Sequence, residues 1–272
     1  DVYVMNANGT NVTNVTISFP PTVRSFEWSP DGTKFVLEAS LGLTESDIFV
    51  IDADGTNPAN ITTPKVVDRL PSWSPDGSRI AFASTREGIT QLNVINVDGT
   101  NAATLANIRT LDRPAWSPDG TRIVFSGVQP SGYRAIFGVN ADGSNLVNLS
   151  NQEGTSAEQP ALSPDGQKIV YRLAVPNSQN VPSNGQIYIM NSDGSNQQML
   201  LDTESSFLFR EWENPRWAPD SNQIVFTGSC FSALPTQQPC ARGIIVIRAD
   251  GTGLTQITDG FTRDFQPDWR RN

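Results

Sequence analysis

Histidine is absent from the 272 residues of this chain. It is the commonest general base, a usual zinc ligand and a member of the Ser-His-Asp and Cys-His catalytic arrangements, so its absence weighs against an enzyme. Long hydrophobic runs are absent too, since no stretch of about 18 apolar residues occurs. The opening residues, DVYVMNANGT, lack the basic and apolar regions of a signal peptide. We therefore expect no membrane span and no retained signal peptide, any export signal having been removed already.

Basic side chains are scarce. The chain has 19 Lys and Arg against 28 Asp and Glu, giving a net charge of -9 and a pI near 4.5. Phosphate binding needs clustered Lys and Arg, so neither nucleic acid nor an anionic membrane surface is an expected partner. The hydrophobic content of 37% is sufficient for a large core.

Two short elements recur along the chain. The first is FEWSPDGTKFVLEAS from Phe26, PSWSPDGSRIAFAS from Pro71, PAWSPDGTRIVFSG from Pro114, PALSPDGQKIVYRL from Pro160, PRWAPDSNQIVFTG from Pro215 and a short sixth copy, PDWRRN, from Pro267. The second is DVYVMNANGTN at Asp1, DIFVIDADGTN at Asp47, QLNVINVDGTN at Gln91, AIFGVNADGSN at Ala135, QIYIMNSDGSN at Gln186 and GIIVIRADGTG at Gly243. A spacing of roughly 43 to 57 residues is typical of propeller blades.

Each repeat predicts four strands. Pro-x-Trp forms strand A, Ser-Pro-Asp-Gly forms a type I turn, and a strand B such as RIAFAS follows. DIFVID forms strand C, and Asp-Gly makes a hairpin into strand D. We expect the tryptophans to pack between neighbouring blades: Trp28, Trp73, Trp116, Trp217 and Trp269.

The sequence therefore predicts an all-β chain, a single domain at 1–272 folded as a six-bladed β-propeller of four-stranded antiparallel blades. The expected blades are approximately 26–62, 71–105, 114–150, 160–201, 215–258, and a last blade in which 265–270 join 1–17 from the other chain end. That last blade lacks a strand B. We expect an upstream segment or a strand from a neighbouring subunit to fill its place, because folded proteins avoid open strand edges.

The pairing of PxWSPDGxxIxF with DIFVIDADGTN resembles the WD-like Pro-Asp repeat of TolB-type β-propellers, over essentially the whole chain. The resemblance implies the propeller fold and leaves function open, because related propellers are periplasmic adaptors, peptidase gating domains, carbohydrate lyases or surface-assembly components. The α/β domain that precedes the propeller of TolB has no counterpart here. Lyases with similar propellers use histidines at their metal site, so the resemblance favours binding.

The connections from strand B to C and from D to A lie on one face and vary in length, as at 174–185, 202–213 and 228–243. Long loops on a rigid scaffold commonly carry function, so we place the binding site on that face. The apolar side chains of SSFLFREW are the expected partner anchors, unless they fold back and cap the blades: Phe207, Leu208, Phe209 and Trp212.

Carboxylates precede strand A, where the chains converge on the channel: Asp68, Asp112, Glu158, Glu213 and Asp264. Arginines stand beside them at Arg24, Arg69, Arg113 and Arg263. A channel mouth rich in carboxylates would suit Ca²⁺ or a basic peptide. Ordinary surface ion pairing is the alternative.

Cys230 and Cys240 are the only cysteines, and they lie in one loop. A disulfide between them would point to an oxidising compartment, whereas two free thiols would suit a reducing cytosol. Zinc is not expected with two sulfurs and no histidine. Acceptor-type glycosylation sequons occur at Asn8, Asn11, Asn14, Asn60 and Asn148, although the repeat turn itself accounts for Asn8.

No nucleophile elbow or phosphate-binding glycine loop stands out. The tetrads such as Asp52-Ala-Asp54-Gly55 resemble the start of a calcium loop but lack its downstream glutamate, and we interpret them as hairpin turns. We expect a non-enzymatic, cofactor-free propeller in the periplasm, secreted or on the cell surface, which binds another protein or a further copy of itself. The alternatives are a surface filament subunit joined by strand donation and a polysaccharide lyase dependent on a divalent metal.

Overall fold

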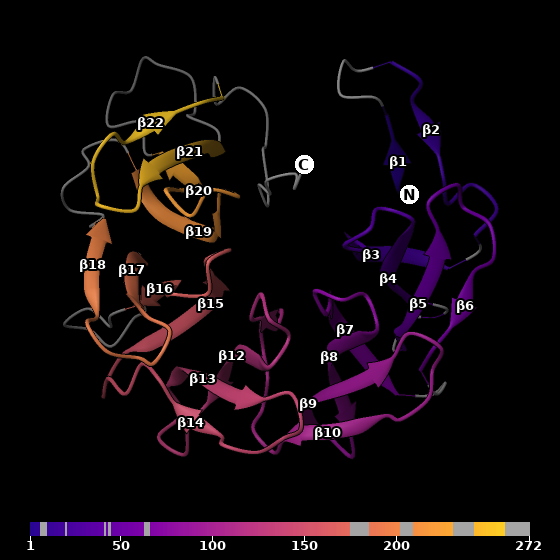
Figure 1. Ribbon diagram of the computed structural model, residues 1–272, viewed down its shortest axis with the longest axis horizontal. Coiled ribbons are helices and arrows are strands. Elements are labelled where there is room, and N and C mark those ends of the chain that lie inside the picture. The colour runs from indigo at the N-terminus through magenta and orange to yellow at the C-terminus, as the bar shows by residue number, and fades with distance from the viewer. Residues whose placement is uncertain are drawn as a thin grey trace. The chain divides into compact units, whose positions relative to one another are not determined.

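A computed structural model describes residues 1–5, 10–19, 21–40, 42, 45–62, 66–174, 185–201, 209–230 and 242–258. These residues form an all-β propeller with blades of four antiparallel strands (Figure 1). The chain divides into two compact units. Unit 1 comprises Asp1–Trp116 and Val139–Asn145, and unit 2 comprises Ser117–Gly138 and Leu146–Asn272.

Five sheets have four strands, hydrogen-bonded in sequence order as the repeat predicted. Blade 1 contains β3 (Thr22–Trp28), β4 (Lys34–Ser40), β5 (Asp47–Asp52) and β6 (Ala59–Asn60). Blade 2 contains β7 (Val67–Trp73), β8 (Arg79–Arg86), β9 (Ile89–Asn96) and β10 (Ala103–Ala106). Blade 3 contains β11 (Ala115–Trp116), β12 (Arg122–Val128), β13 (Arg134–Asn140) and β14 (Val147–Asn148). Blade 4 contains β15 (Ser156–Leu162), β16 (Lys168–Ala174), β17 (Gln186–Asn191) and β18 (Gln198–Leu201). Blade 5 contains β19 (Phe209–Trp217), β20 (Gln223–Cys230), β21 (Arg242–Arg248) and β22 (Thr255–Gln256).

The prediction of six four-stranded blades is wrong for the described residues, which form five. A sixth sheet holds only two strands, β1 (Tyr3–Val4) and β2 (Thr13–Asn14). The reason is that 1–17 supplies only the C and D strands of a repeat, while 265–270 lie outside the described residues. The joining of the two chain ends is therefore not confirmed. Val2 and Val15, which flank the two-stranded sheet, pack against Phe35, Leu37 and other core residues of blade 1.

Strand B is the most buried strand in blades 1 and 2. Residues 35–40 of β4 are all buried, as are residues 80–84 of β8, because both faces of these strands meet apolar side chains. One cluster joins Val36 and Ile48 of blade 1 to Trp73 and Phe82 of blade 2. Burial of about 25 cal/mol per Å² of apolar surface makes these face-to-face contacts the main source of stability.

The repeat turns have the predicted geometry. In the turn from strand A to B of blade 1, the N–H of Gly32 donates to the carbonyl of Ser29 at 2.9 Å. The turn from strand C to D contains Gly55 at φ 87°. A Cβ at Gly55 would lie 2.1 Å from the carbonyl oxygen of Val15, so only glycine lets this turn approach the preceding sheet.

Strand A contains a bulge that the sequence pattern did not predict. The residue before the strand's proline has a left-handed backbone at Leu70 (φ 58°), Gln159 (φ 54°) and Asn214 (φ 55°). The ladder register shifts at these positions. The turned N–H then reaches the preceding blade, where Leu70 donates to Glu38 at 3.1 Å and Asn214 donates to Gln159 at 2.9 Å. The bulge therefore ties blades together.

No helix long and apolar enough to cross a bilayer occurs among the described residues.

Candidate functional site between the blades

A tryptophan at the end of strand A links each of three blades to the blade before it. The indole N–H donates to a backbone carbonyl near the end of strand A in the preceding blade. The acceptor is the residue just before the position equivalent to the tryptophan. The pairs are Trp73 with Glu27 (3.3 Å), Trp116 with Ser72 (3.2 Å) and Trp217 with Ala161 (3.0 Å). All three indoles are buried, as predicted, whereas Trp28 is 42% exposed and packs on Phe35.

An arginine at the start of strand B reaches the next blade in two places, and the first of them is the contact made by Trp116. Arg79 of blade 2 places its guanidinium 5.0 Å from the ring centre of Trp116 and donates to the carbonyl of Ala141, at 3.4 Å, in the C–D turn of blade 3. Arg122 of blade 3 donates in the same way to the carbonyl of Ser192 in blade 4, at 3.0 Å. Each arginine therefore fills the space between its own blade and the next.

Lysines at the same repeat position behave differently. The ammonium of Lys168 donates at 2.9 Å to Asn191, the last residue of strand C in its own blade. Lys34 likewise pairs with Asp52 at the end of strand C in blade 1. A lysine carries a compact ammonium and lacks the planar fork of a guanidinium, and in both blades the ammonium bonds to a partner in its own blade.

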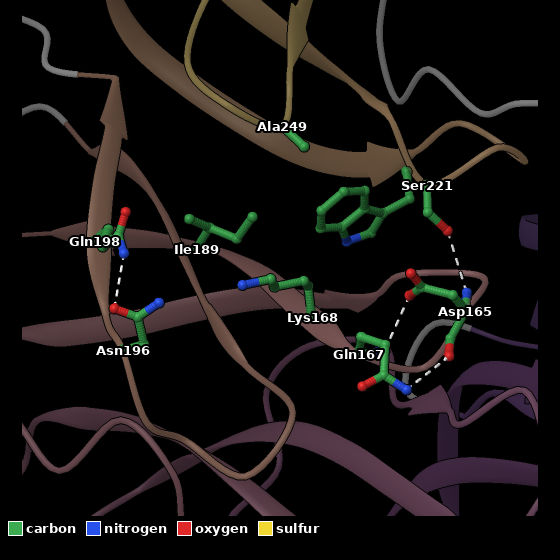
Figure 2. Close-up of a pocket in the computed structure, with 9 residues that line it drawn as sticks. Asp165, Gln167, Lys168, Ile189, Asn196, Gln198, Ser221 and Ala249 are labelled. Atoms are coloured by element: carbon green, nitrogen blue, oxygen red, sulfur yellow. Dashed lines mark hydrogen bonds between the residues drawn. The ribbon is translucent and has the colours of Figure 1, made fainter.

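The consequence at Lys168 is an open pocket of about 210 Å³ between blades 4 and 5, within unit 2. Blade 4 contributes Lys168, Asp165 and Gln167 to one side, and blade 5 contributes Ser221 and Ala249 to the other (Figure 2). The remaining lining residues are Ile189, Asn196, Gln198 and Trp217. The site thus combines an indole, an ammonium, a carboxylate and several amides.

Asp165 keeps its negative charge in this pocket. The hydroxyl of Ser163 donates to its carboxylate at 2.5 Å and the N–H of Gln167 donates at 3.0 Å, and these bonds lower the pKa of Asp165. The hydroxyl of Ser221 accepts from the N–H of Asp165 at 3.2 Å, which connects the turns of the two blades. The walls of the pocket are therefore held in place before any ligand arrives.

Comparison with known proteins identifies the family of this chain. The model of the TolB beta propeller domain matches residues 1–214. The chain belongs to the TolB β-propeller family. A TolB homologue of Chlorobium luteolum is 34% identical over 171 residues, which are 62% of this chain and 37% of that protein. The chain thus matches little more than a third of that relative's length.

Solved structures agree on the TolB-type fold. TolB from Acinetobacter baumannii has a TM-score of 0.68 at 20% identity, covering 92% of this chain and 57% of that one. Oligogalacturonate lyase from Vibrio parahaemolyticus has a TM-score of 0.70 at 13% identity, covering 94% of this chain and 70% of that one. Identities this low show the fold alone, and the fold is shared by TolB and by an enzyme.

The apolar anchors predicted on the loop face of this TolB-family chain are only partly described. Phe207 and Leu208 lie outside the described residues, and Phe209 is described as part of β19 without its side chain. Trp212 is fully buried, where it meets Phe226 at 5.2 Å between ring centres. The expectation that Trp212 is an exposed partner anchor is therefore wrong. Its side chain folds back into the blade, as the alternative prediction proposed.

The carboxylates predicted at the channel mouth have different surroundings. Glu158 forms ion pairs with Arg134 (3.2 Å) and Arg172 (3.1 Å), which agrees with ordinary ion pairing but uses other arginines than the sequence neighbours. Asp112 and Glu213 are partly buried and have interaction partners, and Asp264 lies outside the described residues. A shared calcium site at the mouth stays a prediction.

Asp68 is not at a solvent-exposed mouth, because it is completely buried in unit 1. Among the described residues, neither of its carboxylate oxygens has a hydrogen bond of normal geometry, and the same holds for Oδ1 of buried Asp47. Burial raises the pKa of Asp68, opposed by the nearby hydroxyls of Ser84 and Thr62. In the described part of the chain, no three His, Cys, Asp or Glu side chains gather as metal ligands.

The Asp-Gly tetrads are hairpin turns, as interpreted from the sequence. Asp54 accepts from both the N–H (2.9 Å) and the hydroxyl (2.6 Å) of Thr56, and these bonds lower its pKa. The same pair of bonds recurs at Asp98, Asp142, Asp193 and Asp250. The carboxylate is occupied in closing the turn.

Three sequon asparagines use their side chains within the fold. Asn14 donates to Asp1 (3.2 Å), Asn60 to Asp47 (2.8 Å) and Asn148 to Gln129 (3.3 Å). Glycosylation at these amide nitrogens would compete with these bonds. Asn11 is exposed with φ 55°, while Asn8 and Cys240 lie outside the described residues and the side chain of Cys230 is not described.

The sequence did not predict the pocket beside Lys168, which lies at the short A–B and C–D turns and not on the variable-loop face. A signal was nevertheless present. In the aligned repeats, Arg79 and Arg122 stand where Lys168 stands, and Trp116 stands where Trp217 stands. Lysine thus replaces arginine at position 168, although Lys34 and Trp73 form the same combination between blades 1 and 2, so the signal is a partial one.

Proposed function

We propose that this TolB-family propeller is a non-enzymatic module that binds another protein outside the cytoplasm. The observation that carries the proposal is the pocket between blades 4 and 5. Its volume of about 210 Å³ is below the range of roughly 300 to 1,000 Å³ typical of small-molecule sites. A pocket of this size, with polar walls around an indole, suits a single side chain of a protein partner.

The packing beneath the pocket supports the same proposal. Trp217 and Ile189 line the pocket and also belong to one core cluster with Phe226 and Ile245. Binding would require little reorganisation of this wall, so less free energy is lost in ordering it. The acidic net charge of -9 adds long-range attraction for a basic partner.

An enzymatic function has less support. Histidine is absent from the whole chain, and the described turn carboxylates serve as hydrogen-bond acceptors within their turns. The lyase alternative is tested by incubating the protein with uronate polymers, with and without a chelator. We expect no unsaturated product; metal-dependent product would overturn the non-enzymatic proposal.

The compartment rests on the resemblance to periplasmic adaptors and on the proposed Cys230–Cys240 disulfide. Intact-mass measurement before and after alkylation of the unreduced protein tests the disulfide. We expect no alkylation until a reductant is added. Two reactive thiols in the native protein would contradict the disulfide.

A photo-crosslinking amino acid tests the binding site directly. We would replace exposed Gln167 at the pocket and, as a matched control, exposed Ser78 at the same turn position in blade 2, where Arg79 fills the neighbouring space. In native envelope extract, we expect a discrete protein adduct from position 167 and none from position 78. An adduct with twice the mass of this chain would identify the partner as a second copy. Equal labelling from both positions, or no protein adduct, would overturn the site.

A further inference from the structure

We propose that the pocket between blades 4 and 5 binds an arginine side chain presented by the partner protein. The inference rests on the proposed protein-binding function and specifies its chemistry. It comes from the chain's own repeat, because the equivalent space between blades 2 and 3 contains the guanidinium of Arg79.

The two sites correspond position by position. Lys168 and Arg79 both begin strand B, Trp217 and Trp116 both end strand A of the following blade, and Ala249 and Ala141 both follow strand C of that blade. In blade 3 the indole and the Ala141 carbonyl receive one guanidinium. In blade 5 the corresponding residues, Trp217 and Ala249, line the pocket.

Among the described residues, the groups in blade 5 that correspond to the receptor of Arg79 hold no internal guanidinium. Within the described part of the chain, no side chain donates to the carbonyl of Ala249, and the cation over Trp116 has no counterpart over Trp217. Lys168 directs its ammonium to Asn191. A guest guanidinium could therefore adopt the place that Arg79 occupies in the other unit, stacking on an indole and donating to a turn carbonyl.

The pocket carries one carboxylate, Asp165, and one ammonium, that of Lys168, which is directed to Asn191. Asp165 is ionised and points into the hollow together with Lys168 (Figure 2). A guanidinium is weakly hydrated, stacks on aromatic rings and carries several donors, so it exploits the indole, the carbonyl and the carboxylate at once. An ammonium has no planar face to stack on the indole, and a neutral side chain can hydrogen-bond to Asp165 but lacks the attraction between opposite charges.

The first experiment uses three blocked tripeptides with glycine on either side of arginine, citrulline or lysine. The probe is the indole N–H signal of Trp217 in a nitrogen-15 NMR spectrum, assigned with Trp217→Phe. We expect the arginine peptide to give a saturable shift in the millimolar range, on the order of what one anchoring side chain supplies. We expect binding at least about threefold weaker for citrulline, which keeps the shape without the charge.

Two variants test the origin of the site. Lys168→Arg supplies the guanidinium from within and should abolish the response of Trp217 to the arginine peptide. Arg79→Lys should open the corresponding space and create a new, arginine-dependent shift at the indole of Trp116. The second variant keeps the test decisive even if the first alters the local structure.

Three outcomes would overturn the inference: no saturable shift with the arginine peptide, equal affinity for arginine and citrulline, or an unchanged response in Lys168→Arg. The crosslinking experiment at position 167 stands apart from these. A protein adduct at position 167 without a response to the arginine peptide would support the protein-binding function and contradict arginine as the guest. A clear response to the arginine peptide without an adduct would contradict the protein partner and support arginine binding by the pocket.

Discussion

The contact between blades 2 and 3 in unit 1 and the contact between blades 4 and 5 in unit 2 are built from the same repeat yet end differently. Both have a buried tryptophan that donates to the preceding blade. In the first, Arg79 crosses to the next blade; in the second, Lys168 stays with its own. One substitution in the repeat separates a closed structural contact from an open pocket.

The comparison teaches that the repeat supplies a recognition element as well as a fold. A guanidinium over an indole is an internal ligand at Arg79, held by the chain itself. At Lys168, where the chain has lysine, Trp217 and Ala249 line a pocket instead. A repeat protein can thus acquire a binding site by losing an internal contact, with no new loop.

The largest expected effect concerns the shared part of the two contacts. Trp116→Ala and Trp217→Ala should each lower the free energy of unfolding by about 3 to 5 kcal/mol, because each removes a buried indole and its hydrogen bond. Trp28→Ala, at a 42% exposed side chain, should cost less than about 1.5 kcal/mol and is the control. Chemical denaturation measures all three. A small decrease in the free energy of unfolding at either buried tryptophan would show that the two contacts are not stabilised in the same way.

The repeat explains why much of this could be predicted. Alternation of apolar residues and the Pro-Asp-Gly and Asp-Gly turns predicted strand order and the burial of Trp73, Trp116 and Trp217. The bulge at Leu70 could not be predicted, because a left-handed residue before proline leaves no compositional mark. The pocket was missed because arginine and lysine count alike as charge, although their reach and number of donors differ.

The blade 1 to blade 2 contact provides a third case, with lysine at position 34 and Asp68 buried. Asp68→Asn should raise the free energy of unfolding at pH 7 by about 1 to 3 kcal/mol, because it removes a buried charge without hydrogen-bond partners. Burial raises the pKa of Asp68 in the folded state above its pKa in the unfolded state. The wild type therefore loses stability as the pH rises from the unfolded-state pKa through the folded-state pKa.

The advantage of Asp68→Asn should therefore disappear below about pH 4, where the carboxyl is protonated in both states. Denaturation at pH 7 and at low pH measures the difference, with Asp112→Asn as the partly buried control. A gain that persists unchanged at low pH would mean that charge is not the cause.

Arg79→Lys directly converts the closed contact toward the open one. It should lower the free energy of unfolding by about 1 to 2 kcal/mol, because the guanidinium loses both its place over Trp116 and its bond to the Ala141 carbonyl. Arg109→Lys, at an exposed position, controls for the general effect of the exchange and should be nearly neutral. Equal effects at positions 79 and 109 would contradict a structural role for the Arg79 guanidinium.

Lys168→Arg is the reverse exchange and the smallest expected effect. Arginine at this position should reach the carbonyl of Ala249 and stack on Trp217, raising the free energy of unfolding by about 0.5 to 1 kcal/mol. The gain is smaller than the loss at Arg79, because leaving Asn191 forfeits an existing hydrogen bond. Thermal and chemical denaturation measure it, and the doubly exchanged chain, Arg79→Lys with Lys168→Arg, should show additive effects since the sites share no residue. A Lys168→Arg variant that is destabilised would mean that blade 5 does not accept a guanidinium where blade 3 does, and the equivalence of the two contacts would fail.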